Sequence, residues 1–274
     1  MHSKKILIPL LLYPLKTNLF KIIVLLLVPV LVFGQAIKQK EITHQNQSWF
    51  SINTVTKFSD HWGIVADAHI RENEFLKDNN FYFLRGGIDY IPNAKFSFVA
   101  GYAHMWLAPR NPDWSTYSDE NRIYQQFQMN TKSGNVSILQ RLRNEQRWQE
   151  KIVNDAATGE NRFSDRVRYL ISVTIPVFKK KTAPSLVLSD ELLVQFGKEI
   201  VYNTFDQNRF FVGIKQVINP QLSFDFGYMN VYQQRITGYQ YDMNHTLRLF
   251  FYLTTNLKAK TAAVPVVPAI SGHD

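Results

Sequence analysis

The stretch Val136–Gln149, VSILQRLRNEQRWQ, decides the fold. Successive side chains of a β-strand alternate between its two faces. On an extended chain Arg141, Arg143, Glu145 and Arg147 therefore form one charged column. The opposite face carries Ile138, Gln140, Leu142, Asn144, Gln146 and Trp148. A soluble β-sandwich keeps such charges on its wet exterior, whereas a membrane barrel can turn them toward a polar lumen, so the rest of the chain must decide between the two.

Long extended segments separated by turn residues run through the chain from Asn46 onward. They span residues 46–58, 62–73, 80–91, 95–108, 119–132, 135–149, 161–176, 184–197, 205–218, 221–235 and 243–257. An ordinary soluble strand has about five or six residues, whereas alternating segments of about ten residues are typical of transmembrane strands. The pattern predicts an all-β fold, an antiparallel transmembrane β-barrel.

The breaks between these segments alternate in length. Tight turns fall at residues 59–61, 92–94, 133–134 and 219–220, and longer loops fall at 74–79, 109–118, 150–160, 198–204 and 236–242. Short periplasmic turns and longer outer loops are what an outer-membrane barrel shows. The alternation therefore supports the membrane interpretation.

The expected number of strands follows from a rule of barrel construction. Single-chain bacterial barrels have an even number of strands, and eleven segments are visible. A twelfth, weakly patterned strand within residues 36–45 would restore an even number and would start the barrel on the periplasmic side. We therefore expect about twelve strands, with ten as the alternative.

Polar and apolar side chains separate onto opposite faces in nearly every segment. A charge facing lipid at mid-bilayer costs about 2–4 kcal/mol, so we expect the charged faces to line the lumen. The lumen residues singled out are Arg71, Arg85, Arg122, Arg141, Arg143, Glu145, Arg147, Arg166, Arg168, Arg209 and Arg248. In segment 184–197 the assignment stays open, because Asp190 and Glu191 would fall on opposite faces.

This arginine-rich lumen has two interpretations. In the structural one, arginines and acids on neighbouring strands pair and fill the barrel. In the functional one, the excess of positive charge attracts anions to a pore or a binding site. No single position separates the two interpretations.

The apolar faces carry large aromatic side chains near their ends. Trp49, Trp62, Tyr90, Trp106 and Trp148 occupy such positions. Tryptophan and tyrosine are enriched where a membrane meets water. We expect these five residues to form the interface girdles of the barrel.

The two ends of the chain differ from the strand-rich middle. Four lysines precede an apolar run over residues 22–33, and small residues follow at Gly34 and Ala36. This is the layout of a cleaved secretory signal, with a retained signal anchor as the alternative. We expect a signal peptide over 1–34, a barrel over 35–258 and a flexible, proline-containing tail over 259–274, in the outer membrane of a diderm bacterium.

Composition narrows the remaining classes. The formal charge of +9 includes the four leader lysines, so the mature chain carries about +5. This excess lies in spaced arginines and not in a basic run, so we expect no nucleic acid partner. The absence of cysteine excludes disulfides and cysteine metal sites. Asp67 and His69 share a face but form an ordinary lumen pair more often than a metal site. We expect no metal and no cofactor.

A lipid hydrolase is the competing functional class. His245 and His104 fall on the apolar face near the outer ends of their strands, where a membrane-facing catalytic histidine could lie. Nucleophilic catalysis needs a hydroxyl within hydrogen-bond reach of the base, and the same-face neighbour of His245 is Leu247, not serine. We expect no catalytic residue.

Several short motifs together resemble one known family. They are Trp49, the Asn121-Arg122…Gln125-Gln126 strand, the Arg141-x-Arg143-x-Glu145-x-Arg147 strand, Asn208-Arg209 and Asn244-His245. Over about residues 44–257 the chain resembles the family catalogued as domain of unknown function 2490 (DUF2490), whose members are taken to be outer-membrane β-barrels. The resemblance implies an architecture and a location. The family has no assigned reaction, so it implies no catalytic residues.

The expected function is therefore a non-enzymatic small pore or structural barrel with an Arg/Glu-lined lumen. The first alternative is a lipid-modifying hydrolase, and the second is a soluble periplasmic β-sandwich. The expected partners are outer-membrane lipid and, during biogenesis, the barrel-assembly machinery. A small solute or anion as ligand stays open.

Overall fold

The computed structural model describes residues 38–109, 111–180 and 182–257. Contacts divide the chain into Met1–Gln39 and Lys40–Asp274, and the second unit contains all of the strands. None of the described residues forms a helix that is long and apolar enough to cross a membrane. The expected signal peptide over 1–34 and the expected tail over 259–274 lie outside the described residues.

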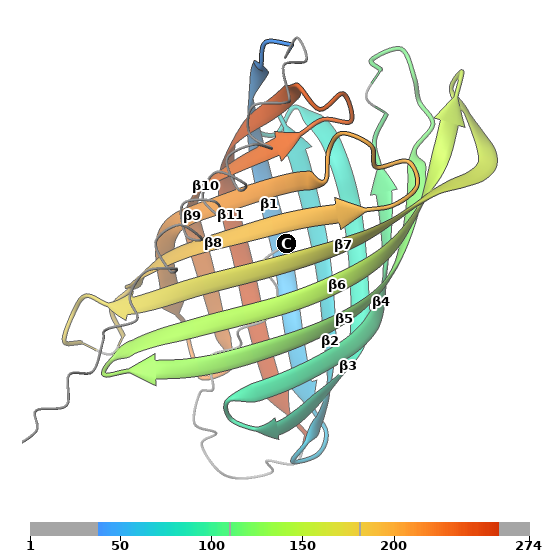
Figure 1. Cartoon of the computed structure of the whole chain (residues 1–274). Helices are drawn as coiled ribbons and strands as arrows, with labels where there is room; N and C mark the ends of the chain where they lie inside the picture. Colours follow the sequence, from blue (N-terminus) through green and yellow to red (C-terminus); the bar gives the residue numbers. More distant parts are fainter. Residues whose placement is uncertain (1–37, 110, 181, 258–274) are drawn as a thin grey trace, which may run out of the picture. The chain divides into compact units, whose positions relative to one another are not determined.

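Eleven β-strands form one closed barrel in the described part of the chain (Figure 1). They are β1 (Glu41–Lys57), β2 (Trp62–Asn73), β3 (Asp78–Asn93), β4 (Phe96–Leu107), β5 (Ser118–Ser133), β6 (Val136–Val153), β7 (Ala156–Pro176), β8 (Ser185–Phe196), β9 (Phe205–Val217), β10 (Leu222–Gln234) and β11 (Gln240–Asn256). The all-β prediction is confirmed, and the alternative of a two-sheet sandwich is wrong because the sheet closes on itself.

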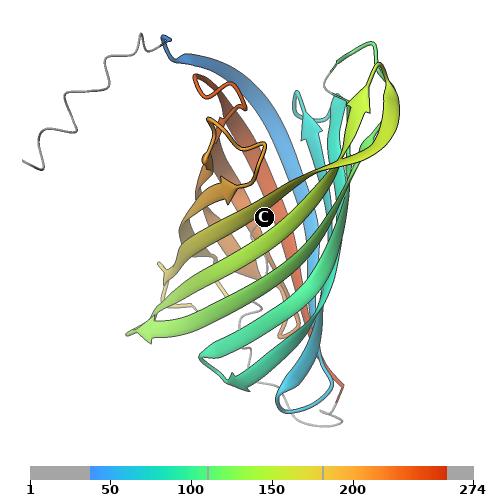
Figure 2. The same ribbon diagram turned by 45° about the vertical axis from the view of Figure 1, so that its right-hand side comes forward.

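Each strand pairs with its neighbour in the sequence in antiparallel fashion, and β1 closes the barrel against β11 in parallel. The parallel register runs from Glu41–Gln240 to Lys57–Asn256. Figure 2 shows the two strands side by side along the wall. Both strands start at the end of the barrel that carries the longer loops, which we call the long-loop end. Both finish at the opposite end, which carries the tight turns and which we call the short-turn end.

The expected counts of twelve and ten strands are both wrong. No separate strand precedes β1 in the described residues; instead residues 41–45 are the first part of β1 itself. The burial alternation starts only at Gln47, because the residues before it are exposed on both faces of the rim. An odd count requires one parallel pair, and that pairing could not be inferred from an antiparallel pattern.

The loop expected at 150–160 is also mostly strand. Strands β6 and β7 continue to a hairpin whose central residues are Asn154 and Asp155. Both have positive φ, 51° and 58°, which a two-residue type I′ turn requires and which asparagine and aspartate tolerate. The hairpin reaches well beyond the end of β8, beside the β4–β5 loop, at the upper right of Figure 1.

Close packing inside the barrel depends on two pairs of glycines. Gly87 faces Gly101 across β3 and β4, and Gly213 faces Gly227 across β9 and β10. A Cβ atom on Gly101 would lie 2.2 Å from the Gly86 carbonyl oxygen and 2.7 Å from the ring of Tyr124. The glycines therefore make room for buried aromatic rings that point inward.

One of the five residues expected in the girdles lies elsewhere. Trp49 points into the lumen and is 3% exposed, whereas Trp62 and Tyr90 are on the outside and 43% and 38% exposed. Trp49 packs against the guanidinium of Arg71, whose Cζ is 3.4 Å from the ring centroid. The sequence prediction failed because β1 alternates with Trp49 on the same face as Ser51 and Asn53, which are polar lumen residues.

Candidate functional site

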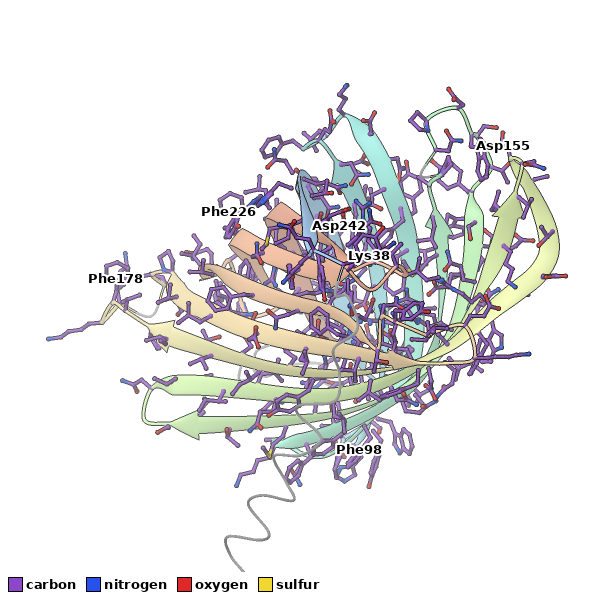
Figure 3. All side chains as sticks on the ribbon, turned by 45° about the horizontal axis from the view of Figure 1, so that its top comes forward. Lys38, Phe98, Asp155, Phe178, Phe226 and Asp242 are labelled. Carbon is purple, nitrogen blue, oxygen red and sulfur yellow. The ribbon has the colours of Figure 1, made fainter. Side chains whose placement is uncertain are left out.

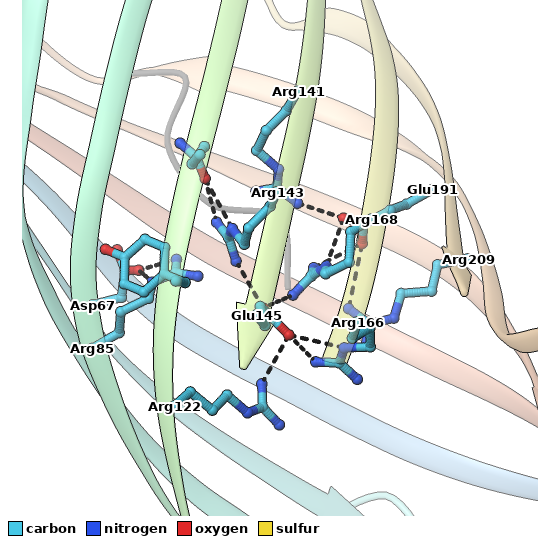
Figure 4. Close-up of polar contacts among 12 residues, drawn as sticks. Asp67, Arg85, Arg122, Arg141, Arg143, Glu145, Arg166, Arg168, Glu191 and Arg209 are labelled. Carbon is cyan, nitrogen blue, oxygen red and sulfur yellow. Dashed lines mark hydrogen bonds and ion pairs between the residues drawn. The ribbon is translucent and has the colours of Figure 1, made fainter. Parts of the chain in front are cut away.

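Glu145 on β6 is the first centre of a charge network in the middle of the lumen (Figure 4). Arg166 donates to its carboxylate from Nε at 2.8 Å and from Nη2 at 2.5 Å. Arg168 donates from Nη1 at 2.8 Å. Arg122 and Arg143 approach the same carboxylate at 3.6 Å. One acid therefore meets four arginines from β5, β6 and β7.

Glu191 on β8 is the second centre. Arg141 donates to it at 2.6 Å, Arg168 donates from Nε at 3.0 Å and from Nη2 at 2.9 Å, and Arg209 donates at 3.4 Å. Arg168 thus bridges Glu145 and Glu191. Sequence reasoning left Glu191 unassigned; in the structure its neighbour Asp190 faces outward and accepts a hydrogen bond from Asn208.

Two smaller groups complete the network on the far side of the lumen. Arg85 on β3 donates to Asp67 on β2 (Figure 4). Asp225 on β10 accepts hydrogen bonds from Arg248 at 3.3 Å and from the Tyr252 hydroxyl at 3.2 Å. Glu145, Glu191, Asp67 and Asp225 each therefore have a cation from a neighbouring strand, the cross-strand pairing that stabilises sheets.

The middle of the lumen is filled. The four arginines Arg141, Arg143, Arg168 and Arg248 are each 1% exposed. Aromatic rings pack against the guanidinium groups; the Cζ of Arg248, for example, lies 3.4 Å from the ring centroid of Phe211. Side chains of this size and burial pack closely together at this level of the described barrel.

Cavities lie at both ends of the described barrel. The larger, of about 670 Å³, opens at the long-loop end, and the smaller, of about 230 Å³, lies near the tight turns. They have no lining residue in common. We refer to the larger cavity as the vestibule; its floor is formed by Arg122, Arg147 and Arg166 and its rim by Trp114, Lys151 and Arg162.

The vestibule carries an excess of positive charge. Its cationic lining residues are Arg71, Arg122, Arg147, Lys151, Arg162, Arg166, Arg168, Arg209 and Arg235. Its acidic lining residues are Glu120, Glu150, Glu199, Asp206 and Asp242. Nine cations against five acids leave a formal excess of four among the lining residues, although Arg166, Arg168 and Arg209 also pair with Glu145 or Glu191 behind the lining. A concave site of one sign focuses the field and attracts small ions of the opposite sign.

Two arginines of the vestibule are bonded to neutral groups. Arg147 donates from Nη2 to Gln195 Oε1 at 2.6 Å, and Arg162 donates from Nη2 to Gln149 Oε1 at 2.8 Å. Within the part of the chain that the structure describes, neither arginine forms an ion pair with a carboxylate. Their charges are therefore not neutralised by direct contact, unlike those in the middle of the lumen.

Loops and the long hairpin are bonded together around the mouth of the vestibule. Asp155 at the hairpin tip accepts hydrogen bonds from the backbone N–H of Thr116 at 2.7 Å and of Ser115 at 2.9 Å. These donors, that of Thr116 foremost, hold the pKa of the Asp155 carboxyl below its ordinary value of 3.8. Lys151 pairs with Glu199 at 3.1 Å, which connects the hairpin to the segment after β8.

The eleven residues singled out from the sequence are all buried inside the barrel. Nine of them belong to the ion-pair groups just described, centred on Glu145, Glu191, Asp67 and Asp225. Arg147 lies apart on the vestibule floor, and Arg71 is held between the rings of Trp49 and Phe81. Of the acids that organise the site, Glu191 was not assigned to the lumen from the sequence. The only signal for its inward orientation was its two-residue spacing from Ser189 and Leu193, which share its face of β8.

The two histidines considered for catalysis lie on the outer face. His245 Nδ1 is 2.7 Å from the Tyr228 hydroxyl, and its Nε2 is 3.1 Å from His44 Nδ1. His104 Nδ1 is 2.8 Å from Asn121 Oδ1. The described residues contain no group of three or more histidine, aspartate or glutamate side chains placed to hold a metal ion.

Comparison with known proteins gives a family. No curated protein matches the chain. The family described as "Protein of unknown function (DUF2490)" matches residues 46–242, well over half of the chain. The matched range extends from β1 into β11 and so takes in both acidic centres of the lumen and the vestibule floor. This chain belongs to the DUF2490 family.

Proposed function

We propose that this chain is a non-enzymatic barrel of the outer membrane of a diderm bacterium, closed at the middle of its lumen. Its partners are then outer-membrane lipid and, during insertion, the barrel-assembly machinery. Of the two forms expected from the sequence, a small pore and a structural barrel, the filled lumen favours the second. A protein of this kind acts through the surfaces and cavities at its ends, not by passing solute.

The outer surface carries the membrane part of this proposal. Each of the eleven strands exposes at least one large apolar side chain, such as Ile52 on β1, Leu84 on β3, Leu142 on β6 and Phe210 on β9. Phe98 and Phe226 project away from the barrel wall in Figure 3. Soluble monomers rarely expose contiguous apolar patches above a few hundred Å². An apolar exterior around a polar, charged interior is the arrangement of a transmembrane barrel.

The burial of the central arginines supports the second part of the proposal, that the lumen is closed at its middle. A charged constriction that conducts ions must leave its charges in contact with water. Arg141, Arg143 and Arg168 are 1% exposed and bonded to Glu191, Gln126 and Glu145. These residues are therefore part of a packed interior, which the structural interpretation of the arginine ladder requires.

Tryptophan quenching by lipid tests the membrane placement. Trp49 faces the lumen, whereas Trp148 is half-buried on the outer face near the long-loop end. Two variants, each with a single tryptophan at one of these positions and phenylalanine at the other four, would be refolded into vesicles containing lipid brominated on its acyl chains. A folded barrel migrates faster on a gel until heated, which verifies folding in each sample.

We expect brominated lipid to quench Trp148 strongly and Trp49 weakly. A folded protein in which neither residue is quenched would exclude the membrane placement. Stronger quenching of Trp49 than of Trp148 would mean that the inside and the outside of the barrel are reversed, and equal quenching of both would mean that the wall is open.

A further inference from the structure

We propose that the vestibule is a binding site for a small polyanion carrying two or more phosphate-type groups. This inference rests on the proposed closed lumen, because a closed floor makes the vestibule a binding pocket and not a passage. The cavity volume of about 670 Å³ lies within the range of about 300–1,000 Å³ that ligand pockets occupy. It is too large for a single water-sized ion and suits a small organic or inorganic polyanion.

The floor of the vestibule places like charges opposite each other. Arg122 on β5 and Arg147 on β6 are direct partners in the strand register and both point inward. Like charges directly opposite across a sheet destabilise it. Arg122 is paired with Glu120 at 2.5 Å, but Arg147 forms no ion pair within the described chain. A bound anion between them would remove the repulsion that remains.

Arg147 is held in place for such a ligand. It is 8% exposed, and its Nε, also buried, has no hydrogen-bond partner among the described residues. Its one protein acceptor is the Gln195 side-chain oxygen at 2.6 Å. The Gln195 amide nitrogen donates to the backbone oxygen of Asn203 at 3.0 Å, which fixes the amide so that its oxygen faces Arg147. The guanidinium is therefore oriented without being neutralised.

Arg162 on the rim is held in the same way. Gln149 accepts its hydrogen bond at 2.8 Å and donates through its own amide nitrogen to the Ser118 hydroxyl at 3.4 Å. Two oriented and unneutralised guanidinium groups thus stand at two heights of one basic cavity. A planar guanidinium matches the paired oxygens of a phosphate group, which favours phosphate over a simple halide.

Titration calorimetry of the refolded full chain in detergent tests the site, with inorganic pyrophosphate and tripolyphosphate as probes. The test variant is R147Q/R162Q. The matched control is K95Q/K132Q, which removes the same charge from exposed positions at the short-turn end, in the turn before β4 and at the end of β5. We expect at least a tenfold loss of affinity in the test variant, a weaker dependence of affinity on salt, and no change in the control.

A folded wild-type chain that binds neither probe would overturn the site, and so would an equal loss of affinity in both variants. If R147Q/R162Q does not fold by gel mobility, R147K replaces it; this variant keeps the charge but loses the fork, and unchanged binding there contradicts the proposed geometry. Competition by vesicles containing a diphosphorylated glycolipid identifies a lipid headgroup as the ligand, and absence of competition identifies a soluble phosphate.

These outcomes are independent of the membrane placement. Binding is measured in detergent, so a failure of lipid quenching leaves the vestibule site intact. Conversely, a chain that is quenched by lipid but binds neither probe remains a membrane barrel without this ligand.

Discussion

In the middle of the lumen arginines meet carboxylates, whereas in the vestibule two arginines meet amides. Arg168 contacts both Glu145 and Glu191 at 2.8–3.0 Å, while Arg147 contacts Gln195. Both arginines are buried, at 1% and 8% exposed. The difference lies in whether the partner cancels the charge. The same residue type therefore fills the lumen at one level and leaves an anion-attracting field at the next.

This contrast answers what the sequence left open. A column of arginines on one strand is compatible with a structural network and with an anion site, and this barrel places arginines bonded to carboxylates at one level and an arginine bonded to an amide at the next. Arg143 and Arg147 are four residues apart on β6 and face the same way. The two arginines differ in the side chains that the neighbouring strands place opposite them, and those side chains are set by the strand register.

Removing the central acid should have the largest effect. The variant E145A would leave Arg122, Arg143, Arg166 and Arg168 without their shared partner. Breaking a buried ion pair by removing one partner costs about 3–5 kcal/mol. The midpoint of urea unfolding in vesicles should fall accordingly. The control E199Q removes only the exposed pair with Lys151 and should change stability by less than about 1 kcal/mol. Similar midpoints for the two variants would refute the contrast.

The packed middle should also resist added volume. In G101A the new Cβ would meet the Gly86 carbonyl oxygen and the Tyr124 ring, and overpacking of this kind costs about 1–3 kcal/mol. In G86A the new Cβ would have only one neighbour, at 3.9 Å, so its stability should stay near that of the wild type. Equal tolerance of both substitutions, measured by the same unfolding assay, would show that the middle of the lumen is loosely filled.

Replacing one arginine at each level sharpens the comparison further. The variant R143M leaves the Gln126 oxygen without its donor and weakens the network, which should cost about 1–3 kcal/mol. The variant R147M likewise leaves the Gln195 oxygen without its donor, but it also removes a charge that opposes Arg122, so it should destabilise the barrel less than R143M does. A larger loss in R147M than in R143M would mean that Arg147 belongs to the structural network.

The smallest expected effect concerns the rim and pH. The pKa of Asp155 is lowered in the folded chain, so its contribution to holding the loop is present above the ordinary pKa of 3.8 and is lost as pH falls through the folded value. Hydrogen exchange at the Ser115 and Thr116 amides should therefore accelerate below about pH 4, corrected for the intrinsic pH dependence. The D155N variant should show no such step. A step that persists in D155N would assign it to another group.

Much of the fold could be predicted from alternation alone. The charged column of β6 and those of β2, β5, β7 and β11 face inward as expected, because a period of two fixes the face once one residue is assigned. The strand count could not be predicted, since the exposed start of β1 has no alternation to read. Trp49 was misplaced because its size suggested an interface, whereas its strand neighbours place it inside.

The candidate site was less accessible to sequence reasoning than the fold. Its arginines stand out by spacing, and Gln149 continues the column of β6, but the partners Glu191 and Gln195 come from β8, which carries no comparable pattern. Which arginine meets an acid and which meets an amide depends on register and on strand tilt around the barrel. Register and tilt are fixed only when the sheet closes into a barrel, so neither can be inferred from any single segment.

Conductance of the refolded protein in a planar bilayer tests the closed lumen most directly. Lipid quenching of Trp148 in vesicles made from the same preparation would verify folding and insertion. We predict no steady current above that of the bare membrane. A steady, anion-preferring current that falls when Arg143 and Arg147 are replaced would contradict the closed lumen and make the arginine ladder a permeation path.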